Sequence, residues 1–132
     1  MHSLLMPVAL ALLVAFAYPA FGDEVLQGKV IQSSGNSVTI TLGLKTGKTP
    51  GRNAGYVGLG DPYACTLKLL FEKTIEGQTS YVIGRGNRGF CKNLTSGRVT
   101  TVFGYNQIHV AVYDSTSTER LAGWVTPVVS EP

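Results

Sequence analysis

Apolar and polar residues alternate in short stretches along this chain, a pattern typical of strands buried on one face. Apolar residues occupy every second position from Val38 to Leu44, and the same period of two runs from Cys65 to Phe71. Further strands are predicted at 24–32, 80–85, 98–105, 107–113 and 124–129, separated by turn residues such as Gly, Asn and Ser. The pattern predicts an all-β fold: a small antiparallel sandwich or a closed barrel of six to seven strands.

Two segments interrupt this alternation. The segment 43–62 carries six glycines and two prolines, and a stretch that buries so little is predicted to be a Gly-rich loop. In the segment 116–123, Thr116 and Glu119 have capping-box spacing. That segment is too short for an independent helix, so we expect a loop or a single helical turn there.

The beginning of the chain predicts a secretion signal. Residues 4–17 are apolar, but this run is shorter than the roughly 20 residues that a membrane-spanning helix needs. Ala20 and Gly22 then provide the small-x-small pattern of a cleavage site, before the acidic residues Asp23 and Glu24. We therefore expect a signal peptide at 1–22 and a single secreted, extracellular β domain at 23–132, with no membrane span after cleavage.

The chain has two cysteines, Cys65 and Cys91. In an oxidising compartment such a pair is most simply a disulfide, which would stabilise the domain by roughly 3 kcal/mol by restricting the unfolded chain. The alternatives are two buried thiols or a link between two molecules.

Several chemistries are not expected from this composition. The formal net charge of +3 is only mildly basic, so nucleic acid is not predicted as a partner. Gly84, Gly86 and Gly89 have the spacing of a dinucleotide-binding motif, but the residues after them do not predict the helix that the motif requires. His109 is the one histidine left after the predicted cleavage. We therefore expect no metal site, no cofactor and no catalytic residues, and hence no enzyme.

Basic residues are concentrated in two segments that also contain glycine. If both segments lie on one edge of the domain, they form a positive patch for an extracellular protein or an anionic glycan. The alternative is that these charges are merely solvated. The candidate binding residues are Arg52 in the first segment and Arg85, Arg88, Lys92 and Arg98 in the second.

Asn93, Leu94 and Thr95 form an N-glycosylation sequon next to Cys91. In a eukaryotic host, Asn93 is therefore a predicted glycosylation site. A glycan there would cover part of the second basic segment.

Two short stretches resemble netrin-type OB barrels. They are Tyr81-Val82-Ile83-Gly84 and the opening strand at 25–31. The resemblance implies a barrel, although the cysteine that this family carries near its mature N-terminus is missing here.

Together these features predict a non-enzymatic extracellular binding or inhibitory module that presents basic, Gly-rich loops on a β scaffold. One alternative is a structural component of an extracellular matrix or coat. Another is a secreted toxin, effector or host-defence protein.

Overall fold

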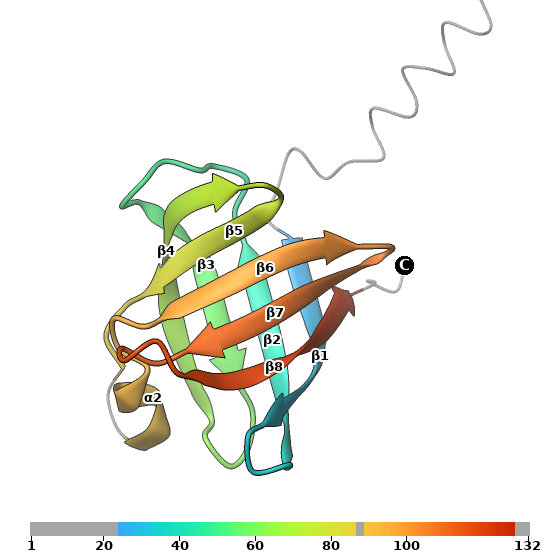
Figure 1. The fold of residues 1–132 in the computed structure, drawn as a ribbon, viewed down its shortest axis with the longest axis vertical. Coiled ribbons are helices and arrows are strands. Elements are labelled where there is room, and N and C mark those ends of the chain that lie inside the picture. Colours follow the sequence, from blue (N-terminus) through green and yellow to red (C-terminus); the bar gives the residue numbers. More distant parts are fainter. Residues whose placement is uncertain (1–23, 87–88, 129–132) are drawn as a thin grey trace, which may run out of the picture.

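The computed structural model describes residues 24–86 and 89–128 of the chain, and they form a closed antiparallel β barrel (Figure 1). Each strand pairs with the next one in sequence, and the last pairs with the first. The elements are β1 (Glu24–Gln32), β2 (Ser37–Leu44), β3 (Asn53–Leu59), β4 (Cys65–Ile75), β5 (Gln78–Ile83), α2 (Gly89–Asn93), β6 (Arg98–Gly104), β7 (Gln107–Tyr113) and β8 (Glu119–Pro127).

The structure confirms the all-β prediction and selects the barrel over the sandwich. The described part of the chain forms eight strands rather than six or seven. The strands follow one another around the barrel in sequence order, whereas an OB fold is a five-stranded Greek-key barrel. The barrel is therefore of the up-and-down type, and the likeness to OB barrels does not extend to its topology.

The additional strand, β3, lies within the segment 43–62, which the sequence predicted to be a loop. Ala54, Val57 and Leu59 of β3 point inward and are buried. Gly55 and Gly58 obscure this alternation in the sequence, and the register of β3 with β4 also shifts between Asn53 and Gly55. The prediction of a 20-residue loop was therefore wrong, and 45–52 is the connection that joins β2 to β3.

The last strand also begins earlier than predicted. Residues 119–123 belong to β8 and pair with β1 and β7, so the loop expected at 116–123 is confined to the turn before Glu119. The short helix α2 was not predicted. One helical turn has too few residues to show a helical period in the sequence. Its buried residue, Cys91, was equally compatible with a loop.

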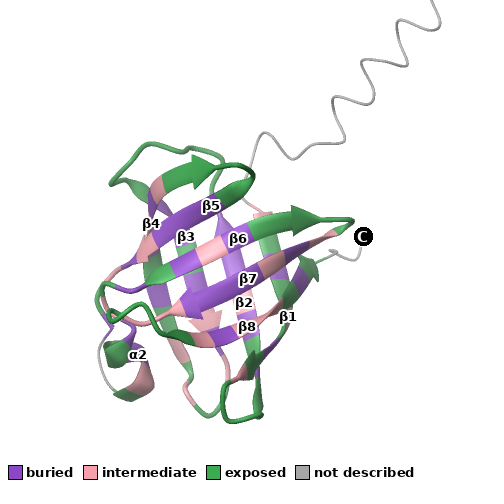
Figure 2. Cartoon of the chain, in the orientation of Figure 1, coloured by how far each residue is buried: buried purple, intermediate pink, exposed green. Residues whose placement is uncertain are grey.

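The interior of the barrel is filled by apolar side chains. Figure 2 shows buried positions along the middle of the strands and exposed positions at several hairpins. An eight-stranded barrel is just wide enough for side chains to fill it. A ligand would therefore have to bind at an end of the barrel or on its outer wall. The interior residues that are no more than 1% exposed include Leu26, Val30, Ile40, Leu42, Leu67, Leu69, Ile83, Val99, Leu121 and Val125.

One end of the barrel, which we call the capped end, is covered by α2. The predicted disulfide between Cys65 and Cys91 is formed and ties α2 to the start of β4. The ring of Phe90 stacks on that of Tyr63 at 4.2 Å between centroids, and the Arg120 guanidinium lies 4.9 Å from the Phe90 ring centre. These contacts hold α2 over the barrel at this end, beside a hollow of about 610 Å³ that residues 62–67 and Cys91 line.

The opposite end, which we call the open end, has no such cover among the described residues. Because neighbouring strands run in opposite directions, the connections alternate between the two ends. The open end is formed by the 45–52 connection, the β4–β5 and β6–β7 hairpins, the start of β1 and the end of β8.

Among the described residues, no helix has the length and apolar character needed to cross a membrane.

Candidate functional site: the open end of the barrel

The two basic segments of the sequence lie at opposite ends of the barrel. Arg52 is in the β2–β3 connection at the open end, while Arg85 and Lys92 are in the β5–β6 connection at the capped end. In an up-and-down barrel these two connections must point in opposite directions. The condition for one shared positive patch is therefore not met. Arg88 lies outside the described residues.

Arg98 begins β6 on the outer wall and is engaged by an acidic neighbour. Its Nε and Nη2 atoms donate to the two carboxylate oxygens of Glu72, each at 2.9 Å. This hydrogen-bonded pair is the main reason why the pKa of Glu72 lies below its ordinary value. The Arg98 guanidinium is thus already neutralised within the chain.

Asn93 is exposed at the end of α2. The hydroxyl of Thr95 in the same sequon accepts a hydrogen bond from the backbone N–H of Gly86 at 2.8 Å. Glycosylation of Asn93 stays a prediction, and a glycan at this position would stand beside Lys92 at the capped end.

The open end contains a hollow of about 230 Å³, which we call the lysine hollow. Strand residues around it are Glu24, Leu44, Thr79, Tyr81, Thr101 and Phe103, and loop residues are Lys45, Thr46 and Lys48. Mouths of β barrels are a common place for ligand sites. This hollow is therefore our candidate functional site.

Three hydroxyl side chains lie where the apolar filling of the barrel meets the open end. Thr79 and Thr101 face each other in the register of β5 and β6, and Tyr81 lies one inward position deeper. The Thr79 hydroxyl is 3.0 Å from that of Thr74. Burial raises the pKa of Tyr81, with a hydrogen bond to Thr101 acting in the opposite direction and the charge of Glu24 adding to the rise. The phenol therefore stays neutral, and hydroxyl groups line the hollow.

Lys45 and Lys48 bring positive charge to this hollow. Both are exposed, and neither belongs to the two ion pairs, Glu72–Arg98 and Asp114–Arg120, that occur among the described residues. Among the described residues, Glu24 is the one acidic residue that lines the same hollow. Two ammonium groups against one carboxylate leave the lining with a formal charge of +1, which favours an anion.

The β6–β7 hairpin adds two exposed aromatic side chains at this end. Phe103 is 74% exposed and Tyr105 is 89% exposed. Phe103 continues the inward-facing series of Val99 and Thr101 beyond the filled part of the barrel, so it borders the lysine hollow rather than packing in the core. This role of Phe103 was not predicted from the sequence, although the period of two through β6 places Phe103 on the same side as Val99 and Thr101.

A second hollow adjoins the first on the other side of Phe103. It has a volume of about 180 Å³, and we call it the apolar hollow. Leu26, Ile108 and Pro127 contribute apolar surface to it, and Glu24 and Phe103 line both hollows. The open end thus combines a hollow that carries two lysines and several hydroxyl groups with a hollow whose described lining has no lysine and includes Asn106 and Gln107.

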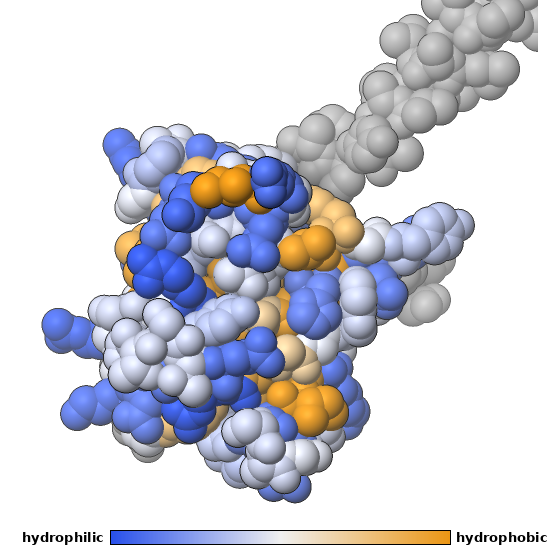
Figure 3. Space-filling model, viewed as in Figure 1, coloured by the Kyte–Doolittle hydropathy of each residue, from blue (hydrophilic) through white to orange (hydrophobic). Residues whose placement is uncertain are grey.

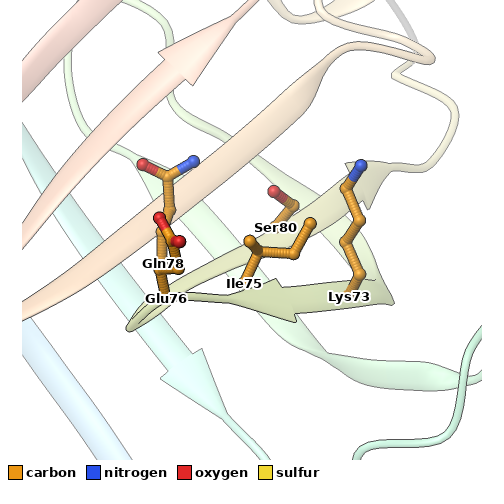
Figure 4. Close-up of a pocket in the computed structure, with 5 residues that line it drawn as sticks. All are labelled: Lys73, Ile75, Glu76, Gln78 and Ser80. Carbon is orange, nitrogen blue, oxygen red and sulfur yellow. The ribbon is translucent and has the colours of Figure 1, made fainter.

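A further hollow, of about 350 Å³, lies on the β4–β5 hairpin. Figure 4 shows Lys73, Ile75, Gln78 and Ser80 projecting from one face of this hairpin, with Glu76 at its turn. It continues into a groove that contains the Glu72–Arg98 pair. The charges of Glu72 and Arg98 already neutralise each other. We therefore expect this face to bind a charged ligand more weakly than the open end does.

The rest of the surface that Figure 3 shows is partly hydrophobic and partly hydrophilic. Hydrophobic side chains appear in Figure 3 as separate small patches among hydrophilic ones. His109, on the outer wall, contacts Trp124 edge-on with 5.0 Å between the ring centres. No group of three or more His, Cys, Asp or Glu residues suited to a metal ion occurs in 24–86 and 89–128.

Comparison of the chain with protein-family models, curated proteins and solved structures found no match. The class is therefore defined by the structure: a disulfide-linked, eight-stranded up-and-down barrel with one capped and one open end.

Proposed function

We propose that this protein is a non-enzymatic extracellular binding module that holds an anionic ligand at the open end of its barrel. The observation that carries the proposal is the position of Lys45 and Lys48, which line a hydroxyl-rich hollow without a described acidic residue bound to either ammonium group. An ammonium group binds an anionic oxygen by charge-assisted hydrogen bonds, which are stronger than neutral ones.

The capped end supports the proposal less well. Its aromatic side chains, Tyr63 and Phe90, are stacked on each other, and Arg120 covers the Phe90 ring. These groups pack against one another, and the hollow of about 610 Å³ that Tyr63 lines at this end contains no charged residue among its described lining. At the open end, by contrast, Phe103 and Tyr105 are exposed, and aromatic side chains are frequent anchors in binding surfaces.

The loop that carries the two lysines is held to the barrel by backbone hydrogen bonds. Lys45 N–H donates to the Ala54 carbonyl at 2.9 Å, and Gly51 N–H donates to the Phe71 carbonyl at 2.9 Å. A loop fixed at both ends loses less conformational entropy when a ligand binds. The loop therefore suits a binding role despite its glycines.

Secretion is part of the proposal. The Cys65–Cys91 disulfide fits an oxidising, extracellular environment, and the apolar run at 4–17 has the length of a signal peptide. Direct sequencing of the N-terminus of the protein from the culture medium tests this part. An N-terminus at Asp23 is expected, and retention of residues 1–22 would contradict it.

Salt elution from immobilised heparin, used as a polyanionic probe, tests which end binds anions. Replacement of both Lys45 and Lys48 by Gln should lower the salt concentration at elution, because it removes charge at the open end. Replacement of Lys29 and Lys68 by Gln is the matched control, since these exposed outer-wall lysines carry the same total charge. The control should elute close to the unmodified protein.

A third variant, with Arg85 and Lys92 replaced by Gln, tests the capped end in the same way. If it loses the most retention, the capped end is the anion-binding surface and the proposal fails. Equal losses in all three variants would mean that heparin senses only the net charge, which also contradicts a site at the open end.

A further inference from the structure

The two hollows at the open end differ in chemistry and share a boundary. The lysine hollow presents two ammonium groups and several hydroxyl groups. The apolar hollow has no basic residue in its described lining, and its apolar surface comes from Leu26, Ile108, Pro127 and the shared Phe103, beside Asn106 and Gln107. Glu24 and Phe103 belong to both linings, so the hollows adjoin. One molecule lying across Phe103 would meet charge on one side and apolar surface on the other.

We infer that the ligand is a small amphipathic carboxylate, with its head in the lysine hollow and a short apolar body in the apolar hollow. This inference rests on the proposed function and names the chemical class of its ligand. The carboxylate would accept hydrogen bonds from Lys45 and Lys48, and the Thr101 hydroxyl lies in the same lining. The apolar body would cover the ring of Phe103, which is otherwise 74% exposed.

The depth of the site limits the length of the ligand. Leu26 and Ile108 form the inner boundary of the apolar hollow and are only 1% and 3% exposed. Below them the barrel is filled by the side chains of its core. A long acyl chain therefore cannot extend into the barrel, and only a body of a few carbons is covered.

Glu24 opposes an anion at this site. Its carboxylate borders both hollows and reduces the positive charge that the lysines supply. The inference therefore predicts that Glu24→Gln strengthens carboxylate binding. A site for a cation or for a neutral molecule would respond in the opposite direction or not at all.

The test is a titration of the ¹⁵N-labelled, oxidised protein with octanoate and with 1-octanol, followed by NMR. These probes have the same chain length and differ in the charge of the head. Octanoate should shift the backbone amide resonances of Thr79, Thr101 and Phe103. It should also bind more tightly than octanol. Among carboxylates short enough to be covered in full, each methylene removed should weaken binding by about fourfold, the value expected for a covered CH₂ group. Lengthening it beyond the hollow should change binding little.

Variants assign the two halves of the ligand to the two hollows. Replacing Lys45 and Lys48 by Gln should weaken octanoate binding by about three- to tenfold and leave octanol binding unchanged. Phe103→Ala should weaken the binding of both probes. Because Phe103 is exposed, this substitution should not disturb folding. The variant with Lys29 and Lys68 replaced by Gln is again the control and should bind octanoate normally.

The outcomes separate this inference from the proposed function. If octanoate causes no shifts at the open end while Lys45 and Lys48 still determine heparin retention, the ligand class is wrong and the anion-binding surface stands. Equal binding of octanol and octanoate, or weaker octanoate binding by Glu24→Gln, would also overturn the inference. Failure of both the heparin and the octanoate experiments would remove the open end as an anion site.

Discussion

The ring of Tyr56 lies across the backbone of Gly43, in the space that a side chain at Gly43 would occupy. The two residues are register partners on β2 and β3. An aromatic side chain that covers a cross-strand glycine replaces the packing that the glycine itself cannot provide. The pair therefore holds together two strands that lead into and out of the loop carrying Lys45 and Lys48.

Gly43→Ala should destabilise the protein by about 1–3 kcal/mol, because the added methyl group must displace the Tyr56 ring or shift the strand. Urea unfolding measures the loss. Gly47→Ala is the matched control, since no atom lies within 4 Å of a side chain at Gly47. A loss at Gly43 no larger than the change at Gly47 would contradict a fixed position for the Tyr56 ring.

The same pair explains which part of the fold was difficult to predict. The alternation from Val38 to Leu44 identified β2, because apolar residues are readable at every second position. In β3 the glycines remove that signal, and Tyr56 faces outward over Gly43 rather than into the core. The existence of β3 depends on pairing with β2 and β4, which are contacts that no local pattern contains.

The candidate site was only partly predictable for a related reason. The basic character of the segment around Arg52 could be read directly from the sequence. Which loops share an end of the barrel depends on the number of strands between them, so a single missed strand reverses the assignment. The engagement of Arg98 by Glu72 required knowledge of the β4–β5–β6 arrangement. The inward position of Phe103, in contrast, follows from the period of β6 alone.

Replacing both Cys65 and Cys91 by Ala should lower the free energy of unfolding by about 3–4 kcal/mol, because the disulfide closes a separation of 26 residues in the unfolded chain. Urea unfolding of this variant and of the oxidised protein measures the difference. The loss should be accompanied by greater hydrogen exchange in α2, which the disulfide ties to β4. A loss below about 1 kcal/mol would mean that the barrel is largely independent of this link.

The turn between β7 and β8 depends on an ionised carboxylate. Asp114 accepts hydrogen bonds from the Thr116 hydroxyl at 2.6 Å and from the backbone N–H groups of Thr116 and Thr118, and its other oxygen contacts Arg120 at 3.1 Å. These bonds, that from the Thr116 hydroxyl above all, lower the pKa of Asp114 to about 2.

Asp114→Asn should therefore lower the Tm at neutral pH. Because the folded pKa is below the unfolded value, the contribution of Asp114 is complete above about pH 4. It decreases as the pH falls through the folded value of about 2. Thermal unfolding of both proteins from pH 7 to pH 2 should show the difference in Tm shrinking at the acidic end. A difference that is constant with pH would show that the carboxylate charge is not what holds the turn.

The Glu72–Arg98 pair should contribute little to stability despite its two hydrogen bonds, because the Arg98 side chain is 46% exposed and the Glu72 side chain 25% exposed. Solvent screens such a pair, and we expect a coupling energy of about 0.5 kcal/mol from a double-mutant cycle with Glu72→Gln and Arg98→Gln. The coupling should decrease in 1 M salt. It should also be lost at acidic pH. Because the hydrogen bond with Arg98 lowers the pKa of Glu72, the coupling decreases below the ordinary pKa of a glutamate and disappears as the pH falls through the lowered value. Because Arg98 is neutralised by Glu72, Arg98→Gln should leave heparin retention nearly unchanged. A large loss of retention would show instead that Arg98 leaves Glu72 to bind the anion.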